Sequence, residues 1–252
     1  MFTTPLHDAF PLFAETGFEG VEVMVTTDPD TQDAGRIADL SERHGLPVVA
    51  VHAPFLLMAR RVFGADPIGK IDRSLELARA VGAPLVVVHP PYRWQSGYRR
   101  WLQEQLPDDS ARGGIRVAVE NMYPVRVRGR HVAGFHHVRT LEDLERFPNV
   151  VLDTSHAAVA GLDLLEATSR LGERLAHVHL SNNAGRGWDS HLPLDEGVLD
   201  LAGFLATLGS SGYTGAISLE IDLRAHRNDP TTLRSTLVRS RRLCADRLTL
   251  SG

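Results

Sequence analysis

The sequence predicts an α/β protein, and among such folds a (β/α)8 TIM barrel. Seven short apolar runs rich in β-branched residues alternate with amphipathic stretches of helical length, an order typical of a parallel sheet. The runs are apolar almost throughout, which indicates strands buried on both faces. The length of 252 residues matches that of such a barrel. A doubly wound sheet is the alternative, but it normally has a glycine-rich phosphate loop after its first strand, and none is found there.

The individual elements follow from these patterns. Helix ends are marked by Gly and then Pro in His44-Gly45-Leu46-Pro47 and Val81-Gly82-Ala83-Pro84. We expect helices at Leu6–Glu15, Asp33–His44, Ile71–Val81, Leu162–Leu171 and Leu199–Leu208. We expect strands at Val21–Val25, Pro47–Val51, Leu85–Val88, Ile115–Val119, Val150–Leu152, Leu175–Val178 and Ala216–Leu219.

The first strand of the barrel is expected to be short or missing at the N-terminus, because only Met1–Thr4 precede the first helical segment. No linker or low-complexity segment divides the remaining chain. The sequence therefore predicts a single TIM-barrel domain over residues 1–252.

Composition excludes several classes of protein. A net charge of −4 gives no drive toward nucleic acid or an anionic membrane surface. No apolar run is long enough to span a bilayer, and Met1–Phe13 lacks the basic start of a signal peptide. The single cysteine, Cys244, excludes an intramolecular disulfide and a thiolate metal cluster. We therefore expect a cytoplasmic enzyme.

The lysine content argues against two kinds of chemistry. Of the 27 basic residues only Lys70 is a lysine, and its place ahead of a helix-like segment predicts a solvated side chain. Schiff-base and pyridoxal-phosphate enzymes need a desolvated lysine at the reaction centre. Both mechanisms are therefore disfavoured.

Polar side chains follow six successive apolar runs directly. In a TIM barrel the carboxyl ends of all strands meet at one rim, so these six side chains are expected to converge. Imidazoles and carboxylates without thiolates suit Zn, Mn, Mg, Fe or Co. Three more candidates are His156, three residues after Asp153, and the Asp189 and His191 of a later loop. The six strand-end residues are His52, His89, Glu120, Asp153, His179 and Glu220.

Together these pieces resemble the xylose-isomerase-like TIM-barrel superfamily, which holds sugar isomerases and epimerases and the endonuclease IV type of AP endonuclease. The resemblance covers about residues 17 to 225. The pieces are Val51-His52-Ala53-Pro54, Val88-His89-Pro90, Val119-Glu120-Asn121, Leu152-Asp153-Thr154-Ser155-His156, His177-Val178-His179-Leu180, Asp189-Ser190-His191 with Glu196-Gly197, and Ser218-Leu219-Glu220.

The resemblance implies two alternative ligand sets. In the isomerase and epimerase members, the residues matching Glu120, Asp153, His179 and Glu220 hold one divalent metal ion. In the endonuclease IV members nine ligands hold three zinc ions, and this chain has all nine counterparts: His52, His89, Glu120, Asp153, His156, His179, Asp189, His191 and Glu220. The cofactor implied is thus a divalent metal, Zn, Mn, Mg or Co, with one to three ions.

Several residues are alternatively expected to bind substrate. His52, His89 and His156 could contact substrate oxygens instead of a metal, and Arg186 could hold hydroxyls or phosphate. Two loops, Tyr92–Trp101 and Val125–His131, interleave arginines with aromatic residues or carry several arginines. Their Trp94 and Arg126 could stack on a sugar or base or bind an anion, although a solvated basic face explains them equally well.

Three functions remain open. The first is a sugar or sugar-phosphate isomerase or epimerase, in which Glu120 and Glu220 transfer a proton beside a metal-polarised carbonyl. The second is an endonuclease IV-like zinc phosphodiesterase acting on abasic DNA, which the net charge disfavours. The third is a non-catalytic metal- or sugar-binding barrel. The expected partner is a small sugar or sugar phosphate rather than nucleic acid or a membrane, and a homo-oligomer is left open.

Overall fold

The computed structural model describes residues 4–54, 61–106, 112–124, 126–127, 130–131, 136, 138, 140–226 and 228–249. The chain divides into two compact units. One comprises Met1–His89 and Gln95–Ala118, and the other comprises Pro90–Trp94 and Val119–Gly252. A single domain over residues 1–252 stays a prediction.

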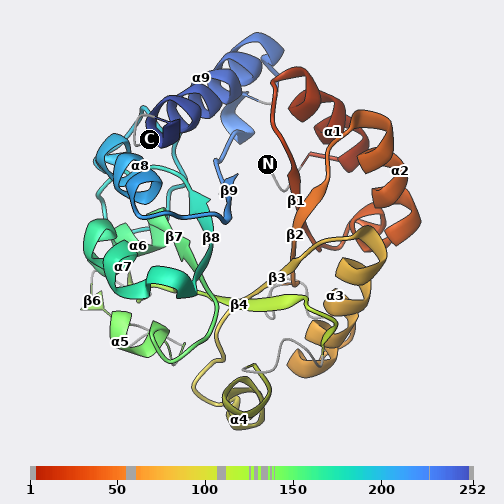
Figure 1. Ribbon diagram of the computed structural model, residues 1–252, viewed down its shortest axis with the longest axis vertical. Helices are drawn as coiled ribbons and strands as arrows, with labels where there is room; N and C mark the ends of the chain where they lie inside the picture. The colour runs from red at the N-terminus through yellow and green to blue at the C-terminus, as the bar shows by residue number, and fades with distance from the viewer. Residues whose placement is uncertain are drawn as a thin grey trace. The chain divides into compact units, whose positions relative to one another are not determined.

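The first unit alternates helices and strands. Strand β1 pairs in parallel with β2, and β2 pairs in parallel with β3. Helices α1, α2 and α3 follow one another along the outer side of these strands (Figure 1). The elements are α1 (Leu6–Glu15), β1 (Val21–Met24), the 3-10 helix η1 (Pro29–Gln32), α2 (Ala34–His44), β2 (Val48–His52), α3 (Pro67–Val81), β3 (Leu85–Val88) and α4 (Ser96–Gln105).

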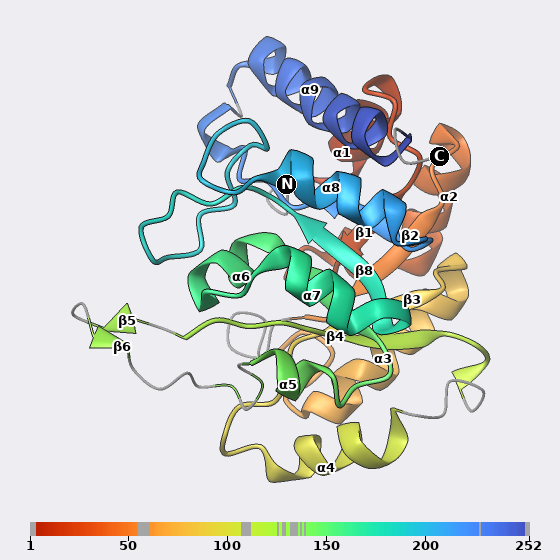
Figure 2. The same ribbon diagram turned by 60° about the vertical axis from the view of Figure 1, so that its left-hand side comes forward.

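The second unit begins at the end of β4 (Arg116–Glu120). Strands β4, β7, β8 and β9 pair in parallel in that order, and α6, α7 and α8 lie beside β8 (Figure 2). The other elements are β5 (Arg126–Val127), β6 (Arg130–His131), α5 (Leu141–Leu144), β7 (Val150–Asp153), α6 (Thr154–Ala160), α7 (Leu164–Leu171), η3 (Gly172–Arg174), β8 (Leu175–Leu180), α8 (Leu201–Ser210), β9 (Ala216–Leu219), η4 (Arg224–His226) and α9 (Pro230–Thr249).

The seven predicted strands form one parallel sheet in the order β1-β2-β3-β4-β7-β8-β9. The α/β TIM-barrel fold is therefore confirmed. Among the described residues, which start at Thr4, no strand precedes α1, and Met1–Thr3 of the expected short first strand lie outside the described residues. The short pair β5–β6 is a separate antiparallel hairpin that the strand pattern did not predict.

Local sequence explains where the helices begin and end. Asp33 caps α2 by accepting the backbone N–H of Arg36 at 3.1 Å, and Asp66 caps α3 by accepting that of Gly69 at 2.7 Å. The predicted C-terminal glycine of α3, Gly82, has φ +74°, the left-handed conformation that ends a helix. Because of the Asp66 cap, α3 starts at Pro67 rather than at the expected Ile71.

Helices α4, α5, α6 and α9 lie outside the helical ranges that the sequence predicted. Residues Ser96–Gln105 of the predicted loop after β3 form helix α4, and α9 covers twenty residues for which no helix was predicted. Both helices are more polar on average than α1, α2, α3, α7 and α8, so no apolar stretch marked them in the sequence. Among the described residues, no helix is both long and apolar enough to cross a membrane.

Candidate metal centre

Four of the predicted ligands in the second unit form one cluster. Glu120, Asp153, His179 and Glu220 each offer one ligand atom, and these atoms lie within 4.8 Å of one another. Glu120 ends β4, Asp153 ends β7 and Glu220 directly follows β9. Because these strands are parallel, all three residues lie at the carboxyl-terminal edge of the sheet. The convergence predicted from strand-end spacing is therefore found for these residues.

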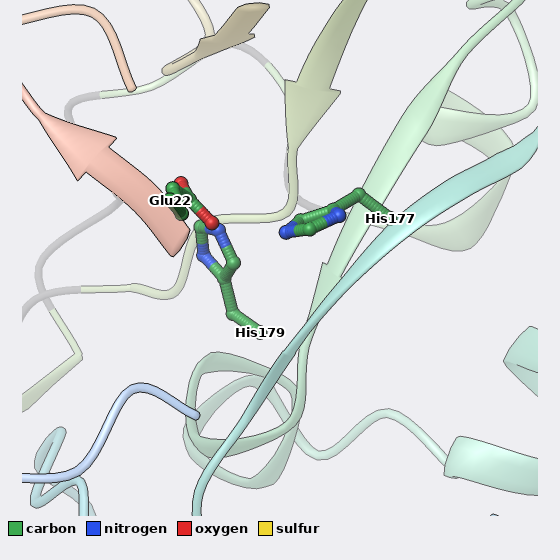
Figure 3. Close-up of side chains that lie close together, drawn as sticks. All are labelled: Glu22, His177 and His179. Atoms are coloured by element: carbon green, nitrogen blue, oxygen red, sulfur yellow. The ribbon is translucent and has the colours of Figure 1, made fainter. Parts of the chain in front are cut away.

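His179 is the centre of this cluster. Its Nδ1 lies 3.1 Å from Glu120 Oε1 and 3.0 Å from Glu220 Oε2. An imidazole nitrogen carries at most one hydrogen, so Nδ1 can donate a hydrogen bond to only one of these two carboxylates. His177, two residues earlier on β8, extends to the same side, with its ring perpendicular to that of His179 (Figure 3). His177 is 1% exposed.

The cluster has the chemistry of a divalent metal site. Asp153 is fully buried, and its Oδ2 has no hydrogen-bond partner among the described residues. Burial, with the charges of Glu220 and Glu120, raises the pKa of Asp153 above its ordinary value, although His156 and His191 oppose the shift. An uncompensated buried carboxylate is costly, and a cation bound to this oxygen would remove the cost. The residues present therefore fit a divalent ion.

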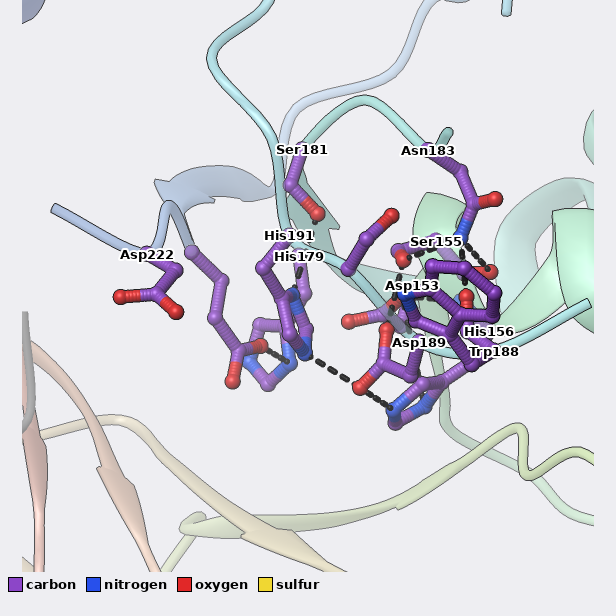
Figure 4. A network of polar contacts seen from close by, with 12 residues as sticks. Asp153, Ser155, His156, His179, Ser181, Asn183, Trp188, Asp189, His191 and Asp222 are labelled. Carbon is purple, nitrogen blue, oxygen red and sulfur yellow. Dashed lines mark hydrogen bonds and ion pairs between the residues drawn. The ribbon is translucent and has the colours of Figure 1, made fainter. Parts of the chain in front are cut away.

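A second cluster adjoins the first through Asp153. Asp153, His156 and His191 offer ligand atoms that also lie within 4.8 Å of one another. Asp189 Oδ2 lies between the two histidines, 2.6 Å from His191 Nε2 and 3.4 Å from His156 Nε2 (Figure 4). The four predicted ligands Asp153, His156, Asp189 and His191 are therefore close together.

The charges of the second cluster stabilise one another. Burial alone would lower the pKa of His191, but the hydrogen bond to Asp189 and the charges of Asp153 and Glu220 raise it to about 9. Burial likewise opposes the shift of Asp189, whose pKa is held well below its usual range by His156 and His191. Without a metal, protonated imidazoles therefore supply the positive charge that this group of carboxylates requires.

Asn121 joins two of the strands that carry the ligands. Its Oδ1 accepts the backbone N–H of Asp153 at 2.6 Å, and its Nδ2 donates to the Asp153 carbonyl oxygen at 3.0 Å. The carbonyl oxygen of Asn121 is 2.9 Å from His156 Nδ1, which leaves Nε2 facing Asp189. Asn121 thus fixes both Asp153 and the ring of His156.

The two remaining predicted ligands lie in the first unit. His52 ends β2 and is 1% exposed, and its Nδ1 lies 2.9 Å from the carbonyl oxygen of Ala53. His89 directly follows β3, and its ring meets that of His52 edge-on, with centroids 5.2 Å apart. The two histidines are therefore brought together.

Lys70 corrects one prediction. It is 2% exposed, and its ammonium donates a hydrogen bond to the carbonyl oxygen of Val62. The side chain lines a cavity of about 20 Å³, large enough for a water molecule, together with His89 and Tyr98. The prediction of a solvated Lys70 was wrong because α3 begins one turn earlier than expected, which turns this residue toward the core.

The predicted substrate-binding residues outside the clusters have different surroundings. Arg186 is exposed and its guanidinium lies 6.0 Å from the ring centroid of Trp188, one residue before Asp189. Trp94 is 62% exposed and stacks on Tyr92 at 4.9 Å. The Arg126 backbone belongs to β5, but its side chain lies outside the described part of the molecule.

His136 is 7% exposed. Its ring packs against Tyr92 at 4.5 Å, and its Nδ1 lies 2.8 Å from the Pro90 carbonyl oxygen. Tyr98, expected in a loop over the pocket, is buried in α4 and donates to the His89 carbonyl oxygen at 2.8 Å. Long-range pairing buries both side chains.

Several residues of the site were not singled out by sequence reasoning. Ser155 Oγ donates to Asp189 Oδ1 at 2.6 Å, and the Tyr123 ring lies 4.7 Å from that of His156. Ser181 Oγ lies 3.1 Å from His191 Nδ1. Asn121, Ser155 and Ser181 are neighbours of predicted ligands along the chain, and that adjacency is the signal that could have found them.

The fold is thus a parallel α/β barrel that carries clustered carboxylates and imidazoles at the carboxyl ends of its strands, and these clusters could hold a divalent metal ion. The chain belongs to the xylose isomerase-like TIM-barrel family, whose model matches residues 10–241. The resemblance stated from the sequence motifs is thereby confirmed, and the family and its structural neighbours consist mostly of enzymes.

The individual relatives are of more than one kind. An uncharacterized protein of Mycobacterium tuberculosis is 36% identical over 238 residues, covering 87% of this chain and 85% of the relative. A probable endonuclease 4 of Heliobacterium modesticaldum is 28% identical over 239 residues, covering 83% and 84%. The crystal structure of a D-tagatose 3-epimerase-like protein superposes with a TM-score of 0.73 at 23% identity, covering 99% of this chain and 96% of that one. The last likeness concerns the fold alone.

Proposed function

We propose that the protein is a divalent-metal-dependent sugar or sugar-phosphate isomerase or epimerase. The observation that carries the proposal is that Glu120 Oε1 and Glu220 Oε2 lie 3.1 and 3.0 Å from the same nitrogen of His179. Two carboxylates thus flank one point beside the buried Asp153. Epimerisation needs two groups near the reacting carbon, one to remove a proton and one to return it, and these two carboxylates are the candidates.

Glu120, Asp153, His179 and Glu220 would hold the metal ion. When bound, a divalent ion supplies Lewis acidity that makes the C–H beside a carbonyl more acidic. In the proposed reaction one of the two glutamates removes that proton and the other returns one to the same or the adjacent carbon. The Glu220 side chain is 23% exposed and that of Glu120 is 2% exposed, so exchange with solvent protons is expected mainly at Glu220.

The residues outside the cluster are assigned to substrate binding. His52 and His89 follow neighbouring parallel strands, and imidazoles there suit substrate hydroxyls or a further ion. His156 is proposed to hold a substrate oxygen when a single ion is bound. Arg186, Trp94 and Arg126 are proposed to contact the distal part of the sugar or its phosphate.

The test is solvent deuterium incorporation at the carbon beside the carbonyl, measured over a panel of ketoses, aldoses and their phosphates. We expect exchange in the metal-loaded protein and its loss in Glu220→Gln. Glu76→Gln is the matched control, because the Glu76 side chain is 65% exposed on α3. Exchange retained by Glu220→Gln would count against the assigned role. Binding of a sugar with no turnover across the panel would support a non-catalytic barrel.

The second cluster favours one alternative, an endonuclease IV-like zinc phosphodiesterase. Asp153, His156, Asp189 and His191 lie together, as this alternative requires of four of its nine implied ligands. The relative of 28% identity named as a probable endonuclease 4 points the same way. Net charge −4 speaks against it, since binding to duplex DNA needs an extended basic surface.

Two measurements separate these functions. Nicking of an abasic duplex that is abolished by chelation would establish the phosphodiesterase. The metal content per chain, with anomalous scattering to place the ions, provides the second criterion. One ion at Glu120, Asp153, His179 and Glu220 supports the isomerase, whereas three zinc ions support the phosphodiesterase.

A further inference from the structure

Ser181 is a buried serine directly after β8 whose hydroxyl meets the ring of His191. It is 0% exposed, and its Oγ lies 3.1 Å from His191 Nδ1. Its backbone is fixed by Thr154, whose Oγ1 donates to the Ser181 carbonyl oxygen at 2.6 Å and accepts the Ser181 N–H at 3.0 Å. The hydroxyl therefore stands on a rigid part of the second unit.

The other nitrogen of His191 has a different partner. Its Nε2 lies 2.6 Å from Asp189 Oδ2, on the side where His156 and Asp153 are found (Figure 4). The backbone of His191 has φ +40°, a left-handed conformation that a non-glycine residue adopts only when its surroundings hold it. The backbone N–H of Asp222 provides such support by donating to the His191 carbonyl oxygen at 2.7 Å.

We propose that Ser181 is a positioning residue that sets the tautomer of His191. Its hydroxyl oxygen accepts the Nδ1–H, so that Nε2 is the nitrogen presented to Asp153, His156 and Asp189. A histidine can bind a metal only through a nitrogen that carries no proton, and a hydrogen bond to the other nitrogen selects which one that is. The inference goes beyond the proposed isomerase, which needs only the ion at Glu120, Asp153, His179 and Glu220. It requires in addition that the cluster of Asp153, His156 and His191 takes up a further ion.

The chain offers a matched control for this contact. Ser218 Oγ lies 2.8 Å from His177 Nε2, so it is also a serine hydroxyl bonded to a buried histidine of the same unit. His177 does not belong to the cluster of Asp153, His156 and His191. Ser218→Ala therefore removes the same kind of hydrogen bond without touching His191.

The first experiment reads the tautomer directly. Long-range ¹H–¹⁵N correlation spectra of the zinc-loaded protein are recorded, and His191 is assigned by comparison with His191→Gln. We expect His191 to carry its proton on Nδ1 and zinc on Nε2 in the wild type, and Ser218→Ala to leave this pattern unchanged. A proton on Nε2, or one zinc ion only per chain at saturation, overturns the proposal. This result does not depend on whether any sugar turns over.

The second experiment measures the zinc affinity of the second site by titration in a buffered zinc series. Loss of the supporting hydrogen bond is expected to weaken zinc binding there about 10- to 100-fold in Ser181→Ala. We expect the zinc affinity of the second site to be unchanged in Ser218→Ala. In Ser181→Ala we expect the zinc affinity of the site formed by Glu120, Asp153, His179 and Glu220 to be unchanged. Equal affinities of Ser181→Ala and wild type overturn the inference. If Ser181→Ala does not fold, the wild-type spectrum still decides. Absence of proton exchange in a wild-type protein with the expected tautomer refutes the proposed isomerase and leaves the role of Ser181 standing.

Discussion

The backbone N–H of Asp222 donates a hydrogen bond to the carbonyl oxygen of His191 at 2.7 Å. Asp222 lies two residues after Glu220, and His191 lies two residues after Asp189. This bond therefore joins the segment that follows β9 to the loop that follows β8, each of which carries proposed ligands. It also holds His191 in its left-handed conformation, with φ +40°.

Alanine ordinarily gives a more stable protein than glycine at the same position, but the positive φ of His191 predicts the opposite order there. Glycine adopts positive φ freely, whereas a Cβ there costs about 1–2 kcal/mol. We expect metal-free His191→Gly to unfold at higher urea than His191→Ala, with an advantage of about 1 kcal/mol. Urea unfolding in EDTA measures the difference. Equal stability would mean that the backbone relaxes to negative φ when the imidazole is removed.

Asn121 is expected to stabilise the fold through its two hydrogen bonds to the backbone of Asp153. Replacing Asn121 with Leu removes its hydrogen bonds to the buried backbone N–H and C=O of Asp153. Each of these groups left unsatisfied costs about 1–3 kcal/mol. We therefore expect Asn121→Leu to lower the free energy of unfolding by about 2–4 kcal/mol and to weaken metal binding through Asp153. Unfolding and metal titration test this, and an unchanged unfolding midpoint would show that water replaces the amide.

The metal-free protein should lose stability as the pH rises from about 6.5 to 9. The folded-state pKa of His191 is about 9, above its ordinary value of 6.5, and that of His156 is raised as well. A raised histidine pKa stabilises the fold fully below pH 6.5, and this contribution is lost as the pH passes the folded-state value. Asp189 and Glu220, with lowered pKa values, are ionised throughout this range and do not change it.

The measurement is the free energy of unfolding in EDTA at several pH values. We expect a decrease on the order of 2 kcal/mol over this interval, and a flatter profile in His191→Gln. Added zinc should remove most of the decrease, because it binds the deprotonated ligands. A profile that rises with pH would contradict the assignment of these shifts.

The only lysine provides a simple test of burial. Because Lys70 is 2% exposed, an amine-reactive acetylating reagent should not modify it in the native protein. Intact-mass spectrometry should then show one label, at the amino terminus, in buffer and two labels in urea. Two labels under native conditions would show that the segment bearing Val62 opens readily.

Lys70→Met should lose the hydrogen bond to the Val62 carbonyl oxygen, and we expect its free energy of unfolding to be lower by about 1–3 kcal/mol.

Strand-end chemistry was predictable because parallel strands share a direction. Val119-Glu120, Leu152-Asp153 and Leu219-Glu220 each place a carboxylate after a buried run, and a parallel sheet brings such positions together whatever the loops between them. His156 was predictable from its distance to Asp153, because the helix that starts at Thr154 turns it back toward the strand end. The fold class, the positions of the strands to within two residues and the candidate ligand residues therefore follow from periodicity and order along the chain.

Other features depend on groups distant in the chain and only the tertiary structure decides them. The burial of Lys70 depends on where α3 begins, and that of His136 depends on its pairing with Tyr92. The hydrogen bonds of Asn121 to Asp153 and of Ser181 to His191 span 32 and 10 residues. Sequence periodicity reports which face of an element is apolar, but the partner that a polar atom finds is set by long-range packing, which has no local pattern.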